Sequence, residues 1–503
     1  MRKVSLLIVT LSIAVSALAL VPPRDPSRRA EWQLQVAAQA NKGEVDAINS
    51  LRRMPAATQA VGERVIIPRV LVITVSFANF AFTTPMADVD SMFNGQNWNK
   101  DGAKGSVRQY FRDQSMGQYD PQFDVVGPVS LSQGYAYYGA GSNGAAKVGY
   151  MVTEACDSVD NIVDFTQYDS DNDGRVDLVY ILYAGYGEND NPNAYVQSVI
   201  PVWSNLIWPA YYNVVSAGYG SNKRIFDGKY IYACEYSNEL DAYYSTADTK
   251  MTAGIGTACH EFGHALGLPD LYQTTGSNTG CGIWDVMDWG MYNDDTYSPP
   301  SYSSYERFYM GWLTPMLITE GDTLTLEHIA TSNEAYMVTL PDTSNLDGLN
   351  PAPSDFYLLE NRQQTGWDRG LPGSGMLMTH VRYNRSKWTS NTVNNTSPLG
   401  VEIIRADGDN SSAWYGQASD LFPEGATQYL GITDHAIEQI TMSAGVIRFV
   451  YRGGVDTTPT DSVATAQPLI NRPAQVCKTI RNGQVLIHTP NGLYNMLGIK
   501  QDY

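Results

Sequence analysis

One segment carries more structural information than any other part of the chain: His260-Glu261-Phe262-Gly263-His264-Ala265-Leu266-Gly267-Leu268-Pro269-Asp270. Two histidines four residues apart on a helix project from the same face, about one turn apart, so both imidazoles can bind one metal ion. The composition predicts this helix over residues 252–266, with Gly267 ending it in a left-handed turn. We expect the intervening Glu261 to face a water on the metal and to serve as a general base.

The third ligand in this interpretation is Asp270. Because Gly267 lets the chain reverse, the carboxylate of Asp270 can return to the two histidines. Two imidazoles and one carboxylate leave the fourth position of a tetrahedral zinc ion open for water, as hydrolysis requires. The alternative is a helix that buries two histidines for packing alone. With only six histidines in the chain, a chance pair at this spacing around a glutamate is improbable.

Met287 follows the zinc segment after a loop rich in Gly, Ser, Thr and Asn. In one interpretation it lies in a tight turn beneath the zinc and gives the histidines an apolar floor, the role of the Met-turn in metzincins. In the other it is an ordinary core methionine. Spacing alone does not separate the two.

A second candidate metal site is a loop with acidic residues at alternate positions: Asp169, Asp171, Asp173 and Asp177, together with the carbonyl of Arg175. Gly174 stands where an EF-hand loop needs its sharp turn. Position twelve is Tyr180 rather than a bidentate glutamate, and a strand follows where an EF-hand has a helix. A solvated turn is the alternative, but clustered carboxylates repel one another without a cation, which favours calcium.

Composition and the N-terminal end restrict the function classes. Lys and Arg are outnumbered 33 to 52 by Asp and Glu, for a net charge of −19, which argues against a nucleic-acid partner. Arg2 and Lys3, an apolar run over residues 4–15 and Ala17-Leu18-Ala19 predict a cleaved signal peptide and hence a secreted protein. The apolar run is too short for a transmembrane anchor.

The five cysteines are odd in number and too few for a disulfide scaffold. Export permits a disulfide, and the pairings that we expect first join Cys259 to Cys234 or to Cys281. Equally, all five can be small buried apolar groups.

The chain is long enough for two or three packed units, and its pattern predicts an α+β fold. We expect strands at 69–77, at 123–126, ended by Gly127-Pro128, and at 178–183, a helix at 106–115, and short strands at 323–326, 356–359 and 446–451. The predicted organisation is a signal peptide (1–19), an N-terminal lead-in or short propeptide (20–64), a catalytic domain (65–315), a β-rich region (316–452), a linker (453–475) and a C-terminal tail (476–503). The tail is similar either to a sorting tail of exported bacterial proteins or to a single strand that pairs with the β-rich region.

Over residues 69–451 the sequence resembles the immune inhibitor A family of secreted zinc metallopeptidases. The resemblance rests on ordered segments: Gly105-Ser106-Val107 with Tyr110, Phe123-Asp124-Val125-Val126-Gly127-Pro128, the Asp-rich loop leading into Ala184-Gly185, the segment 260–270, Trp284-Asp285-Val286-Met287, Gly311-Trp312-Leu313 with Pro315, Glu360-Asn361-Arg362, Gly366-Trp367-Asp368, Leu371-Pro372-Gly373 and His380-Val381. It implies a zincin catalytic fold, metzincin-like, followed by the β-rich region. It also implies a rival third ligand, Glu306, since some zincins take a distant glutamate; the spacing of Asp270 fits the metzincin pattern better.

These observations predict a secreted zinc-dependent endopeptidase that hydrolyses protein or peptide substrates with a metal-activated water, with Glu261 as base. The alternative from another class is a calcium-stiffened adhesin or binding module whose zinc is structural. The open fourth position and Glu261 favour the enzyme, and a protease assay with and without a chelator separates the two.

Overall fold

The computed structural model describes residues 19–28, 64–139, 144–214, 225–275, 280–318, 321–339, 345–410, 416–432, 435–453, 477–481, 484–489 and 492–495. Contacts within the chain group it into two compact units, Met1–Val455 and Asp456–Tyr503. The predicted signal peptide, apart from its last residue, and the predicted linker lie almost wholly outside the described residues.

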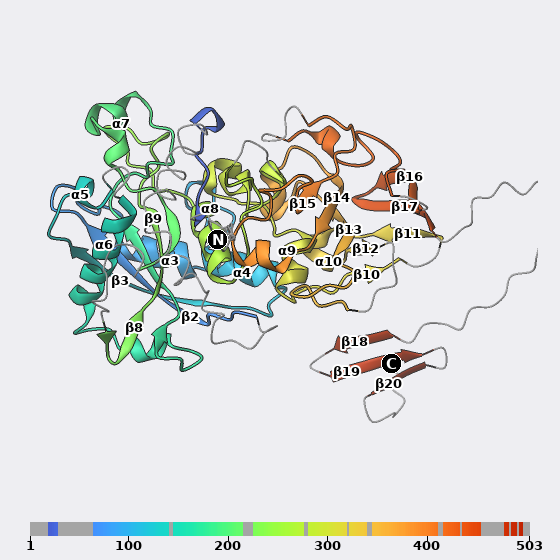
Figure 1. The fold of residues 1–503 in the computed structure, drawn as a ribbon, viewed down its shortest axis with the longest axis horizontal. Coiled ribbons are helices and arrows are strands. Elements are labelled where there is room, and N and C mark those ends of the chain that lie inside the picture. The colour runs from blue at the N-terminus through green and yellow to red at the C-terminus, as the bar shows by residue number, and fades with distance from the viewer. Residues whose placement is uncertain are drawn as a thin grey trace, which may run out of the picture. The chain divides into compact units, whose positions relative to one another are not determined.

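A six-stranded sheet forms the centre of the first part of the chain (Figure 1). Its order is β1 (Ala19–Leu20), β6 (Ala210–Asn213), β9 (Ala233–Asn238), β5 (Val179–Tyr183), β2 (Arg69–Ser76) and β3 (Gln122–Ser130). The four strands from β9 to β3 are parallel, and they are rich in the β-branched and aromatic residues that buried parallel strands favour. Strand β6 runs antiparallel to β9, and β1 runs antiparallel to β6.

Helices cover this sheet. Their bounds are α3 (Met86–Asn94), α4 (Val107–Gln114), α5 (Tyr135–Gly139), α6 (Gly144–Val159), α7 (Ala194–Val199) and α8 (Gly256–Ala265). Helices α3 and α6 contact β3, whereas α8 contacts β9 and β6. A small sheet of β4 (Arg175–Val176), β8 (Lys229–Ile231) and β7 (Ile225–Phe226) follows the Asp-rich loop. The helix with the two histidines therefore packs beside the antiparallel strand of the sheet.

The sequence located five of these elements: β2, β3, β5, α4 and α8. Strands β2 and β5 and helix α4 are confirmed, and Ser106 caps α4 by accepting a hydrogen bond from the Gln109 amide. The predicted end of β3 is wrong, because the strand continues to Ser130 through a register shift opposite Ile73 and Val75. Gly127 adopts φ +110° there, which lets the strand bend rather than stop.

Helix α8 begins four residues later than expected. Thr252 instead forms a bridge with Leu240. Gly256 lies so close to the Met291 carbonyl that a Cβ would clash with it. Gly267 has φ +100°, and the predicted end of the helix by a left-handed turn is confirmed.

Two further sheets occupy the later part of the same unit, on the right in Figure 1. One is β10 (Met316–Leu317), β12 (Tyr336–Val338), β13 (Asp355–Arg362), β14 (Gly375–Arg382) and β15 (Val401–Ile403); the other is β11 (Asp322–Leu326), β17 (Val446–Gly453) and β16 (His435–Ser443). Helices α9 (Ser304–Tyr309), α10 (Ile329–Ser332) and α11 (Arg385–Thr389) accompany them. The chain is thus a mixture of helix and sheet, and the α+β class is confirmed.

The second unit contains a separate antiparallel sheet of β18 (Cys477–Arg481), β19 (Gln484–Thr489) and β20 (Gly492–Asn495). The tail strands pair with one another, so the expectation of a single strand added to the β-rich region is wrong. No helix among the described residues is long and apolar enough to cross a membrane.

The structure corrects the expected disulfide. Cys156, Cys234, Cys259 and Cys281 are all buried and free, so Cys259 is joined to neither of the expected partners. These four residues serve as small apolar core groups, the alternative that the sequence left open.

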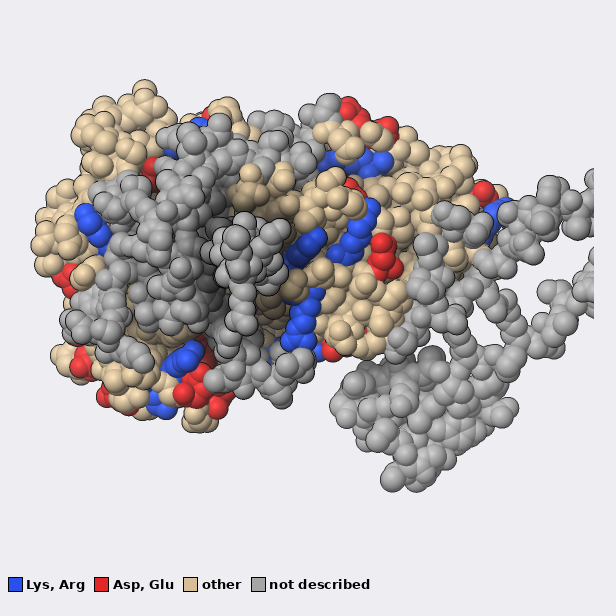
Figure 2. Space-filling model, in the orientation of Figure 1, with Lys and Arg blue, Asp and Glu red and all other residues tan. Residues whose placement is uncertain are grey.

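Charged side chains of both signs are mixed on the face of the molecule that Figure 2 shows. On the face drawn in Figure 2, Lys and Arg side chains gather near the middle, and Asp and Glu side chains lie close to several of them. The acidic excess is therefore not collected on this face into a patch of one sign.

Candidate metal centre

The side chains of His260, His264 and Asp270 converge next to helix α8, which packs against strand β6. The Nε2 atoms of His260 and His264 lie 3.2 Å apart, and Asp270 Oδ1 lies 3.3 Å from the first and 3.1 Å from the second. All three residues are buried, and they form one of two clusters among the described residues that could hold a metal ion. The structure thus brings together the three residues that the sequence singled out as zinc ligands.

The other ring nitrogens fix how the two histidines face. His260 Nδ1 lies 2.7 Å from the Val286 carbonyl, and His264 Nδ1 lies 2.8 Å from the Leu268 carbonyl. A carbonyl can only accept, so each Nδ1 carries a proton, and each Nε2 faces the centre, where its lone pair can bind a metal ion once that nitrogen is deprotonated. The Leu268 carbonyl is available because the chain turns at Gly267.

The donor set fits zinc. Ligands about 2.0–2.1 Å from a zinc ion at the corners of a tetrahedron lie about 3.3 Å from one another. The three separations between the ligand atoms, 3.1 to 3.3 Å, match that spacing. Two imidazole nitrogens and one carboxylate oxygen are also a donor set that zinc enzymes use.

Asn391 holds the Asp270 carboxylate in place, although the sequence gave no sign of it. Its Nδ2 donates to Asp270 Oδ2 at 2.6 Å, and its Oδ1 accepts from the Asp270 amide at 2.7 Å. These two bonds leave Oδ1 of Asp270 turned toward the histidines. Asn391 lies 121 residues further along the chain, just after α11, in the predicted β-rich region.

Burial and charge shift the pKa values at this centre. Burial lowers the pKa of His260. Burial also acts to lower the pKa of His264, but the charge of Asp270 outweighs it and raises that pKa to about 9. Burial raises the pKa of Glu261 to about 8. Neither carboxylate oxygen of Glu261 has a hydrogen-bond partner among the described residues, so the group is free to exchange a proton with a ligand.

A second buried glutamate lies near Glu261 and was missed in the sequence. Glu235 belongs to β9, is fully buried, and has no hydrogen-bond partner among the described residues. Burial, together with the charge of Glu261, raises its pKa well above the ordinary value. The only signal was one acidic residue in the otherwise uncharged strand Ala233–Asn238.

Met287 lies against the helix that carries the histidines. Its Sδ atom is 2.6 Å from where a Cβ on Gly263 would stand, so only glycine fits between the two histidines at that position. The Met287 amide donates to Asp285 Oδ1 at 2.8 Å, and its carbonyl accepts from Leu271. The methionine is fully buried and packs against Gly263 of α8.

Glu306, the rival ligand, lies in a different environment. Its Oε2 accepts hydrogen bonds from the amide and hydroxyl of Ser303, closing a capping box at the start of α9. Burial and the neighbouring carboxylate of Asp285 raise its pKa well above the ordinary value. It is not part of the cluster of potential ligands around the histidines.

In the Asp-rich loop the structure brings together Asp169, Asp171 and Asp177 as the second candidate cluster. Asp173 is not a member; its Oδ1 accepts from the Arg175 amide. Arg175 lies in β4, paired with Tyr230 of β8. An ammonium group already contacts the cluster, because Lys229 Nζ lies 2.5 Å from Asp169 Oδ2.

The N-terminal segment 19–28 lies along strand β6, next to the metal centre. Ala19 pairs with Tyr211 and Leu20 with Ala210. The Tyr211 ring lies 6.4 Å from the His264 ring, centroid to centroid. Ala19 and Leu20 therefore occupy the edge of the sheet beside the strand whose Tyr211 ring lies near His264.

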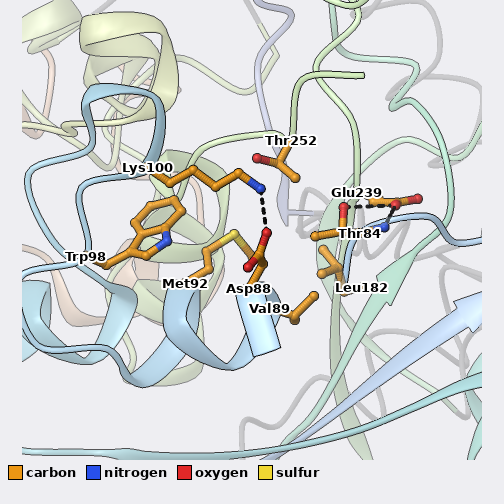
Figure 3. Close-up of a pocket in the computed structure, with 9 residues that line it drawn as sticks. All are labelled: Thr84, Asp88, Val89, Met92, Trp98, Lys100, Leu182, Glu239 and Thr252. Carbon is orange, nitrogen blue, oxygen red and sulfur yellow. Dashed lines mark hydrogen bonds and ion pairs between the residues drawn. The ribbon is translucent and has the colours of Figure 1, made fainter. Parts of the chain in front are cut away.

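A separate small pocket lies among α3, the end of β5 and the loop after β9 (Figure 3). Its lining residues are Thr84, Asp88, Val89, Met92, Trp98, Lys100, Leu182, Glu239 and Thr252. The polar groups there pair with one another: Lys100 with Asp88 at 2.9 Å, and Glu239 Oε1 with the amides and hydroxyls of Thr83 and Thr84. This pocket serves as a structural junction, and we assign it no chemistry.

Comparisons with known proteins agree with the geometry. Residues 88–312 match the family model described as immune inhibitor A peptidase M6, catalytic domain. Over 293 residues, 51% of this chain, the sequence is 25% identical to the pre-pro-metalloprotease PrtV of Vibrio cholerae serotype O1, of which the match covers 30%. Over 274 residues, 47% of this chain, it is 25% identical to Immune inhibitor A of Bacillus thuringiensis subsp. alesti, of which the match covers 38%. The matches thus span about a third of the length of these curated relatives.

Proposed function

We propose that the chain is an exported zinc endopeptidase that hydrolyses peptide bonds in proteins, since residues 88–312 match the catalytic-domain model of the immune inhibitor A peptidase family. The observation that carries the proposal is the spacing of His260 Nε2, His264 Nε2 and Asp270 Oδ1 beside the partnerless carboxylate of Glu261. The predicted signal peptide supports export.

Three features support a zincin fold of the metzincin type. The two histidines lie on one helix that packs beside an antiparallel strand of the sheet. The chain turns at Gly267 and returns with Asp270. Met287 then lies against that helix in the position that a Met-turn would take.

In the proposed mechanism His260, His264 and Asp270 hold the ion, and Asn391 keeps the Asp270 carboxylate aimed at it. A zinc ion held there would supply Lewis acidity to a scissile carbonyl and to water. Glu261 would take the proton from that water and pass it to the leaving amine. Its burial suits this task, because a carboxylate without a hydrogen-bond partner is a stronger base than a solvated one.

The decisive variant is Glu261→Gln, which keeps the size of the side chain and removes the base. We expect the purified variant to bind one zinc per chain, as the parent does, and to hydrolyse casein at least about 100-fold more slowly, since a positioned general base contributes about 10²–10⁴-fold. Zinc is measured by atomic absorption, and hydrolysis by release of labelled peptides. A variant as fast as the parent would show that another group is the base. A zinc-loaded parent that cleaves no protein would favour the binding module with a structural zinc.

We also propose that the Asp-rich loop binds calcium through Asp169, Asp171 and Asp177. What supports it is the convergence of three carboxylates on a short loop whose glycine has φ +86°. The Lys229 ammonium contacts one of these carboxylates, Asp169, so a calcium ion would compete with it there.

A further inference from the structure

The segment from Val21 to Arg24 is held by backbone hydrogen bonds, in addition to the fully buried side chain of Val21. The Val21 carbonyl accepts from Trp208 Nε1 at 2.8 Å, and the Pro22 carbonyl accepts from the Tyr292 hydroxyl. The Arg24 amide donates to the Asn189 carbonyl at 2.9 Å. Backbone contacts of this kind accept any sequence, so they form a general peptide-binding track that continues from β6.

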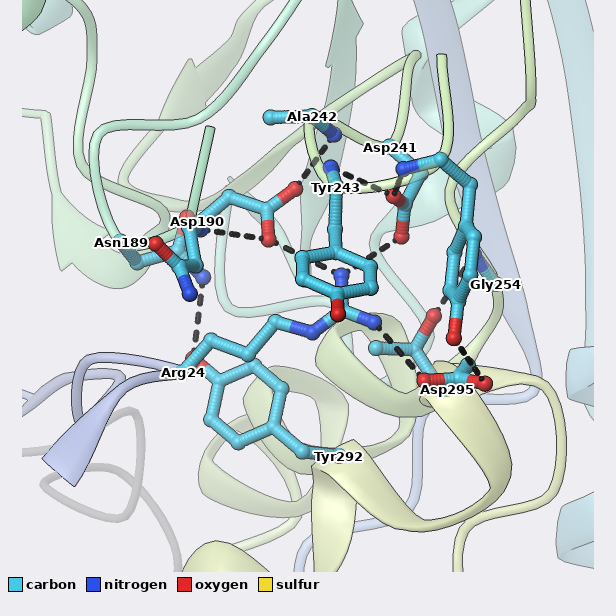
Figure 4. A network of polar contacts seen from close by, with 12 residues as sticks. Arg24, Asn189, Asp190, Asp241, Ala242, Tyr243, Gly254, Tyr292 and Asp295 are labelled. Carbon is cyan, nitrogen blue, oxygen red and sulfur yellow. Dashed lines mark hydrogen bonds and ion pairs between the residues drawn. The ribbon is translucent and has the colours of Figure 1, made fainter. Parts of the chain in front are cut away.

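One side chain of the segment is bound specifically. Arg24 Nη1 lies 2.9 Å from Asp190 Oδ1 and 2.7 Å from Asp241 Oδ2, and Nη2 lies 3.2 Å from Asp295 Oδ1 (Figure 4). The Arg24 side chain is only 11% exposed. The rings of Tyr243 and Tyr244 lie 5.5 and 5.9 Å from its Cζ, within the range of cation–π attraction. We call Asp190, Asp241, Asp295, Tyr243 and Tyr244 the arginine pocket.

Backbone groups hold the two buried carboxylates of the pocket. Asp190 Oδ2 accepts from the Ala242 amide at 2.7 Å. Asp241 Oδ1 accepts from the amides of Tyr243 and Tyr244, both at 2.8 Å. Each aspartate therefore turns its other oxygen toward the guanidinium, and the arrangement is set by the fold of the loop rather than by Arg24 alone.

The pocket requires a cation. Asp190 and Asp241 are at most 5% exposed. Burial, together with the charge of Asp190, raises the pKa of Asp241, and Arg24 opposes that shift. Without a guanidinium, two buried carboxylates would face each other at the cost of desolvation and repulsion. A neutral side chain cannot relieve that cost.

We infer that the arginine pocket is a specificity pocket for a basic side chain, arginine before lysine, in the peptides that this protein cleaves, and that Arg24 occupies it here as a substrate side chain would. The inference rests on the proposed function and adds the substrate class. Arginine is preferred because its planar fork reaches three carboxylates at once and stacks on aromatic rings, which a lysine ammonium cannot do equally well. In the segment, Leu20 lies opposite Ala210 and Arg24 follows four positions later. A substrate peptide bound in the same direction and register would carry its basic residue at the position of Arg24.

Binding is measured first, separately from hydrolysis. The protein is the full chain with Glu261→Gln, to prevent cleavage, and Arg24→Ala, to empty the pocket. Two fluorescent peptides copy residues 20–28 and differ only in arginine or the neutral isostere citrulline at the position of Arg24. We expect the arginine peptide to bind at least about 10-fold more tightly, because citrulline offers the buried carboxylates no charge-assisted hydrogen bond.

The Asp241→Asn variant in the same background should bring the two affinities within about twofold of each other. The matched control is Asp88→Asn, which removes a half-exposed aspartate from the ion pair with Lys100 and should leave the preference unchanged. Equal affinities for both peptides in the unsubstituted pocket would overturn the proposal, and so would a preference that persists in Asp241→Asn. The peptide comparison stands even if the Asp241 variant does not fold.

Hydrolysis then tests the arginine preference separately from the proposed peptidase activity. The zinc-loaded Arg24→Ala protein is given peptide substrates with arginine, lysine or citrulline at the same position, and kcat/KM is compared. Cleavage of all three at one rate would overturn the specificity and leave the proposed function standing. Cleavage of none, with the binding preference intact, would contradict the proposed function and leave an arginine-selective peptide site.

Discussion

At the scale of single residues, Asp270 depends on a partner far away in the chain. Its Oδ1 points to the histidines because Asn391 holds Oδ2 and the backbone amide. Removing Asp270, the proposed ligand, should therefore weaken zinc binding more than removing Asn391, which orients it. We expect Asp270→Ala to abolish stoichiometric zinc binding, and Asn391→Ala to weaken it about 10–100-fold, the usual cost of losing an outer-sphere hydrogen bond.

The matched control for these two substitutions is Glu306→Gln. Because Glu306 caps α9 and lies outside the cluster, the variant should bind zinc as the parent does, even if it unfolds at a lower temperature. Zinc affinity is measured by competition with a chromogenic chelator. Loss of zinc in Glu306→Gln with retention in Asp270→Ala would show that the distant glutamate, not Asp270, is the third ligand.

The same residues show what a single sequence can and cannot reveal. His260, Glu261, His264 and Asp270 lie within eleven positions, so helix geometry and one glycine turn predict their meeting. Asn391, Glu235 and the arginine pocket are joined to the centre only by long-range packing. Nothing in the local pattern of Asn391, 121 residues beyond Asp270, marks it as different from any other loop asparagine.

The secondary structure around the Asp-rich loop places a lysine ammonium on one of the carboxylates that we propose as calcium ligands. Lys229 belongs to β8, which pairs with β4 in the loop, and its ammonium contacts Asp169. A bound calcium ion would have to displace it. We expect millimolar CaCl2, but not MgCl2, to raise the melting temperature of the protein, since a ligand at 100 times its dissociation constant adds about 2.7 kcal/mol of stability.

The Lys229→Met variant sharpens this test. Removing the competing ammonium should lower the calcium concentration that gives half of the thermal shift, whereas Asp171→Asn should remove most of the shift. Differential scanning calorimetry at a fixed zinc concentration measures both. A parent and a Lys229→Met protein that are equally indifferent to calcium would rule out the site.

The bounds of helices and strands were predicted well where a local residue pattern determines them. They were predicted poorly where long-range packing determines them. The apolar run of β2 and the Ser106 cap of α4 are local signals, and both elements appear as expected. Strand β3 runs past Gly127-Pro128 because its pairing with β2 continues beyond a register shift, which a local reading of a glycine and a proline cannot foresee. The tail likewise pairs with itself, a choice among partners that no strand pattern decides.

A network of buried ion pairs joins the predicted catalytic domain to the strands that follow it in the chain. Arg362 in β13 lies 2.9 Å from Glu360 and 2.8 Å from Asp368, and all three side chains are fully buried. Asp368 also accepts from the Ser301 amide at 2.7 Å, and Glu360 accepts from the Ser304 amide at the start of α9. With Asn391, this network indicates why residues 316–452 group with the catalytic part in one compact unit.

The network makes a pH-dependent prediction for Asp368→Asn. Burial alone would raise the pKa of Asp368, but Arg362 and the hydrogen bonds outweigh it and hold the pKa below the ordinary value. The carboxylate therefore stabilises the folded state fully above about pH 4, its unfolded pKa, and this contribution is lost as the pH falls through the folded pKa. Breaking a buried pair costs about 3–5 kcal/mol; we expect about 3 kcal/mol, because Glu360 still pairs with Arg362.

Urea unfolding of parent and variant at pH 7 and at steps below pH 4 checks this expectation. The difference in unfolding free energy between parent and variant should reach its full value at pH 7 and should decrease as the pH is lowered. The control is Asp120→Asn, which breaks a more exposed ion pair with Arg108 and should cost less than about 1 kcal/mol. A difference in unfolding free energy for Asp368→Asn no larger than that of the control would mean that the buried network contributes little to holding the two regions together.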